Sequence, residues 1–201
     1  MPIITQLKMQ TKNKDRVNVH LDDKFFCGLT TEAVVKQNLK VGNEISEQEL
    51  ELVQFESDKQ MAFNKVLNLI SKSQKTKKQI KDYLTTKGYG QKTIDYVILK
   101  LEEYNYINDA LFAKNYVNFN ASSKGARRLR QELIQKGVSA KNIDEAISNI
   151  DSQDEVIERL AIKYMNNKEK NQKNYSKLYA YLTRRGFSYD QIAPYLKISE
   201  E

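Results

Sequence analysis

The sequence predicts a mainly α-helical protein: three tandem three-helix repeats with a 49-residue period, forming an elongated, curved array behind a small N-terminal segment that contains a β-hairpin. The period comes from Gly88, Gly137 and Gly186, each preceded by a basic residue. Apolar residues recur at fixed distances from each glycine, so the segments compare without gaps. Such repeats are typical of arrays whose neighbouring units bury faces that one unit cannot.

The N-terminal segment carries the pattern of strands. Between residues 17 and 21, and again between 25 and 29, apolar residues alternate with polar ones, and Asp-Asp-Lys separates the two runs. This alternation predicts a hairpin with one buried face, which residues 3–9 extend with a third strand. The residues expected to face inwards are Val17, Val19, Leu21, Phe25, Cys27 and Leu29.

Two helices are expected to follow the strands. Thr31 is a candidate cap for a short helix over residues 32–39, which ends near Gly42. Ser46 and Glu49 form a capping box that opens a second helix. No clear helix breaker stands between residues 49 and 72, so this helix is expected to continue into the first repeat.

Each of the three glycines is predicted to end one helix just before another begins. Apolar pairs four residues apart precede the glycines, as on the buried stripe of a helix: Ile80 and Leu84, Leu129 and Leu133, Leu178 and Leu182. A glycine with positive φ then suits the residue after the helix end. Candidate caps of the next helices are Gly90, Ser139 and Ser188. Hydrophobic staples are expected between Tyr89 and Ile94, Val138 and Ile143, and Phe187 and Ile192.

A further helix is expected ahead of each pair, with Phe63 and Leu67 as its inner face in the first copy. The equivalents are Phe112 and Tyr116, then Ala161 and Met165. In the second copy Asn108 is the candidate cap, with Ile107 stapled onto Phe112. We therefore divide the chain into a β/α head, residues 1–58, and three repeats, residues 59–108, 109–152 and 153–201.

Charge is divided unevenly along the chain. Residues 1–58 carry seven basic and ten acidic side chains, whereas the rest carries twenty-six and sixteen. A basic body favours a polyanionic partner, either nucleic acid or an acidic protein groove, although solubility alone also accounts for it. One cysteine excludes an intrachain disulfide, and no apolar run reaches signal or membrane-spanning length. We therefore expect a cytoplasmic protein that has no membrane partner.

The sequence offers no catalytic constellation. His20 is the only histidine and lies on the polar phase of a strand, which leaves no triad or metal cluster. Cys27 shares the apolar phase and is expected to be a buried structural thiol. Neither GxxxxGK[ST] nor GxGxxG occurs. The sequence therefore predicts a non-enzymatic protein without cofactor or metal.

Basic residues recur on one helix of every predicted repeat. A lysine stands thirteen residues before each glycine and a basic residue stands immediately before it. Aligned along an array, such charges make a stripe suited to a polyanion. The residues adjoining the glycines have a second interpretation, because a cation also stabilises a helix C-terminus. The candidates are Lys75, Lys77, Lys78, Lys81, Lys124, Arg127, Arg128, Arg130, Lys136, Lys173, Lys177, Arg184 and Arg185.

Residues 124–133, Lys-Gly-Ala-Arg-Arg-Leu-Arg-Gln-Glu-Leu, followed by Lys136-Gly137, resemble the central signature of the RecX regulatory family. Upstream, Tyr-Ile-Asn-Asp at residues 106–109 is similar to that family's entry into its second repeat. The first repeat departs from the pattern at Gln79, where an acidic residue is more usual. The resemblance covers about residues 60–198, and the head is similar to the N-terminal extension of some members.

The resemblance implies an all-α, three-repeat regulator that docks in the groove of the RecA–DNA filament. The resemblance implies that such docking inhibits ATP hydrolysis, coprotease activity and strand exchange, or limits filament growth, and so acts in recombination, DNA repair and the SOS response. We expect a monomer. The residues alone leave two alternatives open: sequence-nonspecific binding of single- or double-stranded DNA through the same stripe, and a helical scaffold for another partner.

Overall fold

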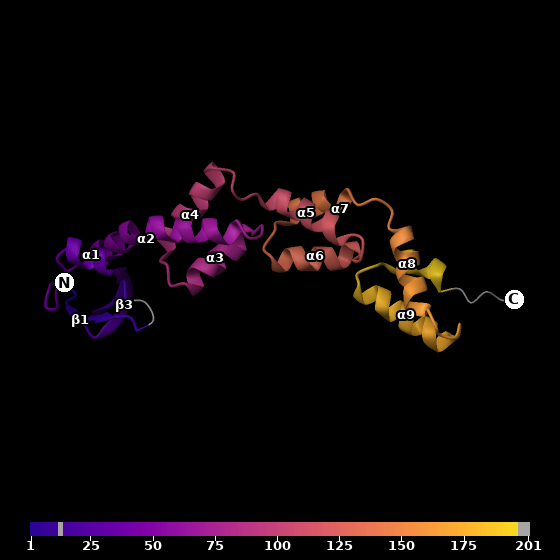
Figure 1. The fold of residues 1–201 in the computed structure, drawn as a ribbon, viewed down its shortest axis with the longest axis horizontal. Helices are drawn as coiled ribbons and strands as arrows, with labels where there is room; N and C mark the ends of the chain where they lie inside the picture. Colours follow the sequence, from indigo (N-terminus) through magenta and orange to yellow (C-terminus); the bar gives the residue numbers. More distant parts are fainter. Residues whose placement is uncertain (12–13, 197–201) are drawn as a thin grey trace. The chain divides into compact units, whose positions relative to one another are not determined.

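The computed structural model describes residues 1–11 and 14–196, and the end of the predicted third repeat lies outside the described residues. Contacts divide the chain into two compact units, residues 1–107 and 108–201. The first holds a three-stranded antiparallel sheet and one three-helix domain, and the second holds two more three-helix domains (Figure 1). The predicted fold class is thereby confirmed in its elements: three helical repeats behind a strand-containing head.

The sheet has the strand order β1 (Ile4–Met9), β2 (Arg16–Leu21) and β3 (Lys24–Thr30). Asp22 and Asp23, with φ of 45° and 65°, form the two-residue turn between β2 and β3. Two successive left-handed residues match the right-handed twist of a hairpin, and Asp tolerates that conformation. The hairpin and its third strand are both as predicted.

One part of the strand pattern was predicted wrongly. Phe25 was expected to be buried with Cys27 and Leu29, but its side chain is 59% exposed. The pairing of β2 with β3 shifts between Val19 and His20, so the inward phase changes along β3. A bulge of this kind reverses which side chains face the core. Phe25 instead meets His20 edge to face, with ring centroids 5.8 Å apart.

Two helices complete the head. Helix α1 (Thr31–Lys36) is capped by the Thr30 side chain and ends before left-handed Asn38. The expected helix over 32–39, with Thr31 as cap, was therefore one residue late and too long. Helix α2 (Glu47–Ile70) opens with the predicted Ser46–Glu49 capping box. Its N-terminal half packs through Leu50 on the sheet, and its C-terminal half packs through Val66 on the first repeat.

The repeats share a helix order. In the first unit α2 is followed by α3 (Lys77–Thr86) and α4 (Gln91–Glu103). The second repeat consists of α5 (Asp109–Asn120), α6 (Ala126–Gln135) and α7 (Ala140–Ser148). The third consists of α8 (Asp154–Met165), α9 (Gln172–Arg184), α10 (Tyr189–Ile192) and the 3₁₀ turn η1 (Ala193–Tyr195).

The three glycine turns have one geometry. Gly88, Gly137 and Gly186 adopt φ of 80°, 82° and 93°. The following amide donates to the carbonyl five residues back, at 3.2, 3.1 and 3.3 Å in the three turns. This is a Schellman turn, which satisfies the last carbonyls of a helix and requires a left-handed residue. All six predicted staple residues are buried beside these turns.

The first helix of each repeat departs from the 49-residue spacing. The fully buried pairs there are Ala62 and Val66, Ala113 and Val117, and Ile157 and Ala161. The expected inner residues lie beside them and pack against each core from its edge, apart from Ala161, which is itself buried. Asn108 caps α5 as predicted, but Ile107 is buried in the first unit's core instead of stapling onto Phe112.

A buried ion pair joins the sheet to α2. Arg16 on β2 contacts Asp58 on α2, with Nη1 3.1 Å from Oδ1, and Arg16 Nη2 donates to the Gly28 carbonyl at 2.7 Å. Neither side chain is exposed. Burial raises the pKa of Asp58 and outweighs the opposing effect of Arg16. The pair therefore fixes the sheet against α2, and removing either partner would leave the other charge buried without compensation.

Substitution of Arg16 tests this dependence. Arg16→Met should lower the free energy of unfolding by about 3 kcal/mol, because it leaves the Asp58 carboxylate buried and unpaired. The double variant Arg16→Met/Asp58→Leu should recover most of that loss. Urea denaturation followed by circular dichroism measures both. Lys59→Met, which breaks an exposed pair with Glu56 on the same helix, is the control and should cost at most about 1 kcal/mol. Equal losses for the two single variants would contradict the assignment.

Candidate binding surface

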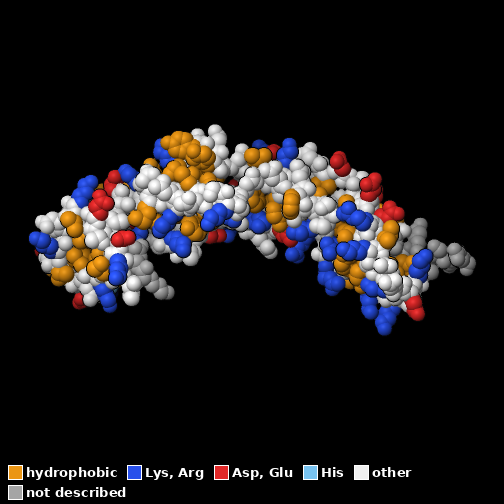
Figure 2. Space-filling view, in the orientation of Figure 1, with side chains coloured by type: hydrophobic (Ala, Val, Ile, Leu, Met, Phe, Trp, Pro, Cys, Tyr) orange, Lys and Arg blue, Asp and Glu red, His pale blue; other side chains and the backbone are white. Residues whose placement is uncertain are grey.

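The predicted basic residues lie on or next to α3, α6 and α9, the middle helix of each repeat. The helices occupy this position because each ends at a glycine turn and turns its leucine or isoleucine pair into the core. The opposite face is left to polar side chains, as on any amphipathic helix. Over α9 the Lys and Arg side chains gather on one side of the second unit (Figure 2).

The lysines thirteen residues before the glycines are not equivalent. Lys75 and Lys124 precede the N-termini of their helices, whereas Lys173 lies in the first turn of α9. The cause is the length of α9, which has thirteen residues where α3 and α6 have ten. Lys173 therefore occupies a different position on its helix from Lys75 and Lys124.

On α6 two candidates share one carboxylate. Glu132 accepts from Lys124 Nζ at 2.7 Å and from Arg128 Nε at 2.8 Å. The Tyr116 hydroxyl of α5 donates to it at 2.7 Å. Partial burial raises the pKa of Glu132, but these three donors outweigh it and lower the pKa to about 2. The charges of Lys124 and Arg128 are thus largely compensated by Glu132 within the repeat.

Other candidates are also engaged by the protein. Arg130 Nη2 lies 2.5 Å from Asp144 of α7, Lys78 Nζ lies 2.7 Å from Asp82, and Lys77 pairs with Glu102. These three pairs are exposed, so each holds its cation only weakly.

Two candidates next to the glycines lie over tyrosine rings. Lys136 lies over the Tyr116 ring with Nζ 5.2 Å from its centroid. The Arg185 guanidinium lies 4.6 Å from the Tyr181 centroid and donates to the Ser123 carbonyl. The guanidinium of Arg185 is therefore engaged within the second unit.

Six candidates remain available to a partner. Within residues 1–11 and 14–196, their side chains make no ion pair, hydrogen bond or ring contact with another residue. Arg127 on α6 and Arg184 on α9 are the two arginines among them, and both are exposed. The six are Lys75, Lys81, Arg127, Lys173, Lys177 and Arg184.

Sequence reasoning missed the residues that neutralise this surface. Glu132 was seen only as part of the signature, although its position four residues after Arg128 is the usual spacing of a helical ion pair. Asp144 gave no such signal, because it reaches Arg130 from another helix. Tyr116 was assigned to packing, and its hydroxyl additionally fixes the Glu132 carboxylate.

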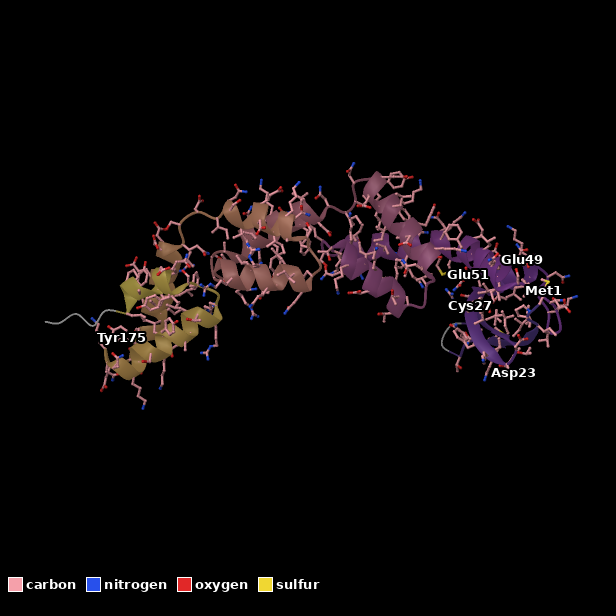
Figure 3. The ribbon with its side chains drawn as sticks, turned by 180° about the vertical axis from the view of Figure 1, so that it is seen from behind. Met1, Asp23, Cys27, Glu49, Glu51 and Tyr175 are labelled. Atoms are coloured by element: carbon pink, nitrogen blue, oxygen red, sulfur yellow. The ribbon has the colours of Figure 1, made fainter. Side chains whose placement is uncertain are left out.

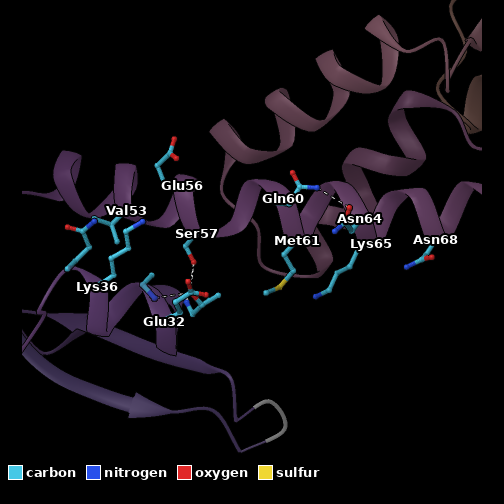
Figure 4. A pocket seen from close by; sticks show the side chains of 13 residues that line it. Glu32, Lys36, Val53, Glu56, Ser57, Gln60, Met61, Asn64, Lys65 and Asn68 are labelled. Carbon is cyan, nitrogen blue, oxygen red and sulfur yellow. Dashed lines mark hydrogen bonds between the residues drawn. The ribbon is translucent and has the colours of Figure 1, made fainter.

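The first unit has a groove between α1 and α2 that carries charges of both signs. It is lined by Glu32 and Glu56 as well as Lys36 and Lys65 (Figure 4). Cys27 lies between the sheet and α2 (Figure 3), and burial raises the pKa of its thiol to about 12. The thiol is thus structural, as predicted, because it remains protonated and unreactive.

Models of known protein families match most of this chain. Models of the three RecX three-helix domains match residues 62–101, 108–147 and 151–196, and the model of the RecX N-terminal domain matches residues 2–46. The chain belongs to the RecX family of regulatory proteins. The RecX resemblance of the central signature is confirmed, and the RecX match also covers residues 2–46 of the head.

Several RecX relatives are similar in sequence or structure. Regulatory protein RecX of Clostridioides difficile is 39% identical over 61% of this chain and 57% of its own. Regulatory protein RecX of Bacillus subtilis is 34% identical over 59% of this chain and 45% of its own. The chain thus matches about half the length of these curated relatives. A RecX crystal structure from Lactobacillus salivarius aligns with a TM-score of 0.62 and 28% identity over 69% of this chain and 94% of that one. Another RecX crystal structure has the same fold, with a TM-score of 0.64 and 24% identity over 96% and 98%.

Two structural findings bear on other classes of function. In the part of the chain that the structure describes, no helix has the length and apolarity needed to cross a membrane. Over the same residues no three His, Cys, Asp or Glu side chains are grouped to hold a metal ion.

Glu132 provides a pH-dependent test of the α6 cluster. Glu132→Gln should lower the free energy of unfolding at pH 7 by about 1–2 kcal/mol, since it removes a carboxylate that accepts from three donors. Because its folded pKa is depressed, the contribution is fully present above about pH 4.5 and is lost as pH falls towards 2. Urea titrations at pH 7, 4 and 3 should show the two proteins converging. Glu145→Gln, at an exposed site on α7, is the control, and a wild-type advantage of the same size at pH 7 and pH 3 would refute the assignment.

Proposed function

We propose that this RecX protein binds the RecA recombinase in its filament on DNA and inhibits ATP hydrolysis, coprotease activity and strand exchange. It acts by binding rather than by catalysis, as a monomer, in the bacterial cytoplasm where RecA works. The observation that carries the proposal is membership of the RecX family through all three repeats and the head.

The free cations supply a physical basis for this binding. Arg127 and Arg184 are exposed, and their side chains make no ion pair, hydrogen bond or ring contact with another residue that the structure describes. A guanidinium group binds carboxylate or phosphate in a bidentate manner. Lys173 and Lys177 lie four residues apart on α9 and so share a helix face. An acidic groove of the filament would complement such a surface, which steers association and sets orientation.

Binding of DNA alone is the alternative, and the same residues favour it. Lys and Arg side chains along α9 can neutralise phosphates of either single- or double-stranded DNA. That binding would be insensitive to sequence, because phosphate contacts carry no sequence information directly. Its affinity would fall steeply with salt, by roughly one power of salt concentration for every phosphate neutralised.

The rate of DNA-dependent ATP hydrolysis by RecA, with this protein titrated in, tests the proposal. Wild type should inhibit, and Arg127→Glu/Arg184→Glu should raise the half-inhibitory concentration about tenfold, because two exposed charges are reversed. Lys114→Glu/Lys163→Glu makes the same charge change on α5 and α8 and should leave inhibition nearly unchanged. An uninhibited RecA, or equal effects of the two double variants, would contradict the proposal.

Titration onto labelled DNA without RecA separates the two candidate functions. We expect this protein to bind DNA alone at least tenfold more weakly than the RecA filament at moderate salt. Comparable affinity for bare DNA, with a steep salt dependence, would favour the alternative.

A further inference from the structure

Helix α6 has no cap of its own. Its N-cap is Gly125, which has no side chain to accept from the first free amide groups. The equivalent helix of the first repeat is capped by Thr76, and that of the third by Asn171. Free helical amides that are shielded from water need acceptors. The acceptors for α6 must therefore come from elsewhere in the unit.

The third repeat supplies them. The Gly125 amide donates to the Arg185 carbonyl at 2.8 Å, and the Arg127 amide donates to the Gly186 carbonyl at 3.2 Å. Both carbonyls lie at the C-terminal end of α9, so α9 ends on the start of α6 (Figure 1). The negative end of one helix dipole thus meets the positive end of another.

This contact leaves no room for a side chain on either glycine. A Cβ on Gly125 would lie 2.4 Å from the Gly186 carbonyl oxygen, and one on Gly186 would lie 2.3 Å from the Arg128 amide nitrogen. Gly90 is also a glycine N-cap, that of α4, and a Cβ placed on it would have no atom closer than 3.5 Å. The need for glycine at 125 therefore comes from the close approach, because its φ of −81° suits any residue.

The turn that leads into α6 is held by the same repeat. Four successive carbonyls, those of residues 121–124, accept hydrogen bonds from side chains beyond residue 150. Gln153 Nε2 donates to the first and fourth at 2.7 and 3.0 Å, Arg159 to the second at 2.7 Å, and Arg185 to the third at 3.1 Å. Gln153 is itself buried.

We propose that this joint between the second and third repeats assembles the binding surface. It fixes the N-terminus of α6, with Arg127, against the C-terminus of α9, with Arg184, and so presents the two unengaged guanidinium groups to one acidic partner. Gly125, Gly186 and Gln153 are then positioning residues, which act through the arginines without touching the partner. The inference rests on the proposed function for the partner, but not for the joint itself.

The joint is tested by the distance between spin labels at exposed positions 141 on α7 and 163 on α8, in a full-length Cys27→Ala background. Wild type should give one narrow distance distribution by double electron–electron resonance. Gly125→Ala should broaden or shift it, while Gly90→Ala, the matched N-cap control, should reproduce wild type. Gln153→Ala removes two hydrogen bonds without a steric clash and should also broaden it. An unchanged distribution in both Gly125→Ala and Gln153→Ala would overturn the joint.

Inhibition of RecA then tests the positioning role. Gly125→Ala should raise the half-inhibitory concentration at least fivefold with its helical circular dichroism intact, and Gly90→Ala should not. A widened distance distribution with unchanged inhibition would overturn the positioning role. If wild type fails to inhibit RecA, the proposed function falls, and the distance measurement still decides whether the joint exists.

Discussion

The left-handed glycine turn is the constraint on which the rest of the structure depends. At Gly88, Gly137 and Gly186 the backbone takes a conformation that side chains disfavour, and the helix ends with its last carbonyls satisfied. The reversal brings the next residue, Tyr89, Val138 or Phe187, into the core. In every repeat, therefore, one face of the middle helix packs against the core, and the opposite face carries charged side chains.

The third of these turns has a second role that the first lacks. A Cβ on Gly88 would have open space around it, whereas one on Gly186 would strike the backbone of α6. A local device for ending a helix thus becomes the contact that holds two repeats in one unit. Near this contact the cations divide into two groups: Lys124 and Arg128 are held by Glu132, while Arg127 and Arg184 have no partner among the described residues.

Features set by neighbouring residues were predictable from the sequence. Ser46 with Glu49, the glycine turns and the staple isoleucines all rest on contacts within a few residues. The failures involve longer range or a change of phase: the bulge that exposes Phe25, and the burial of Ile107 in another core. The candidate site was predictable as a set of basic residues. Which of them are paired was not predictable, because partners such as Asp144 lie on other helices.

In the proposed function, the faces of α6 and α9 that carry Arg127 and Arg184 contact RecA. Photo-crosslinking tests it most directly, with a benzophenone amino acid placed one turn from each arginine, at exposed positions 131 and 180, and at exposed position 118 on α5 for comparison. We expect positions 131 and 180 to crosslink to RecA in filaments on DNA, and position 118 not to do so. Crosslinks to DNA alone, or to RecA from position 118 only, would contradict it.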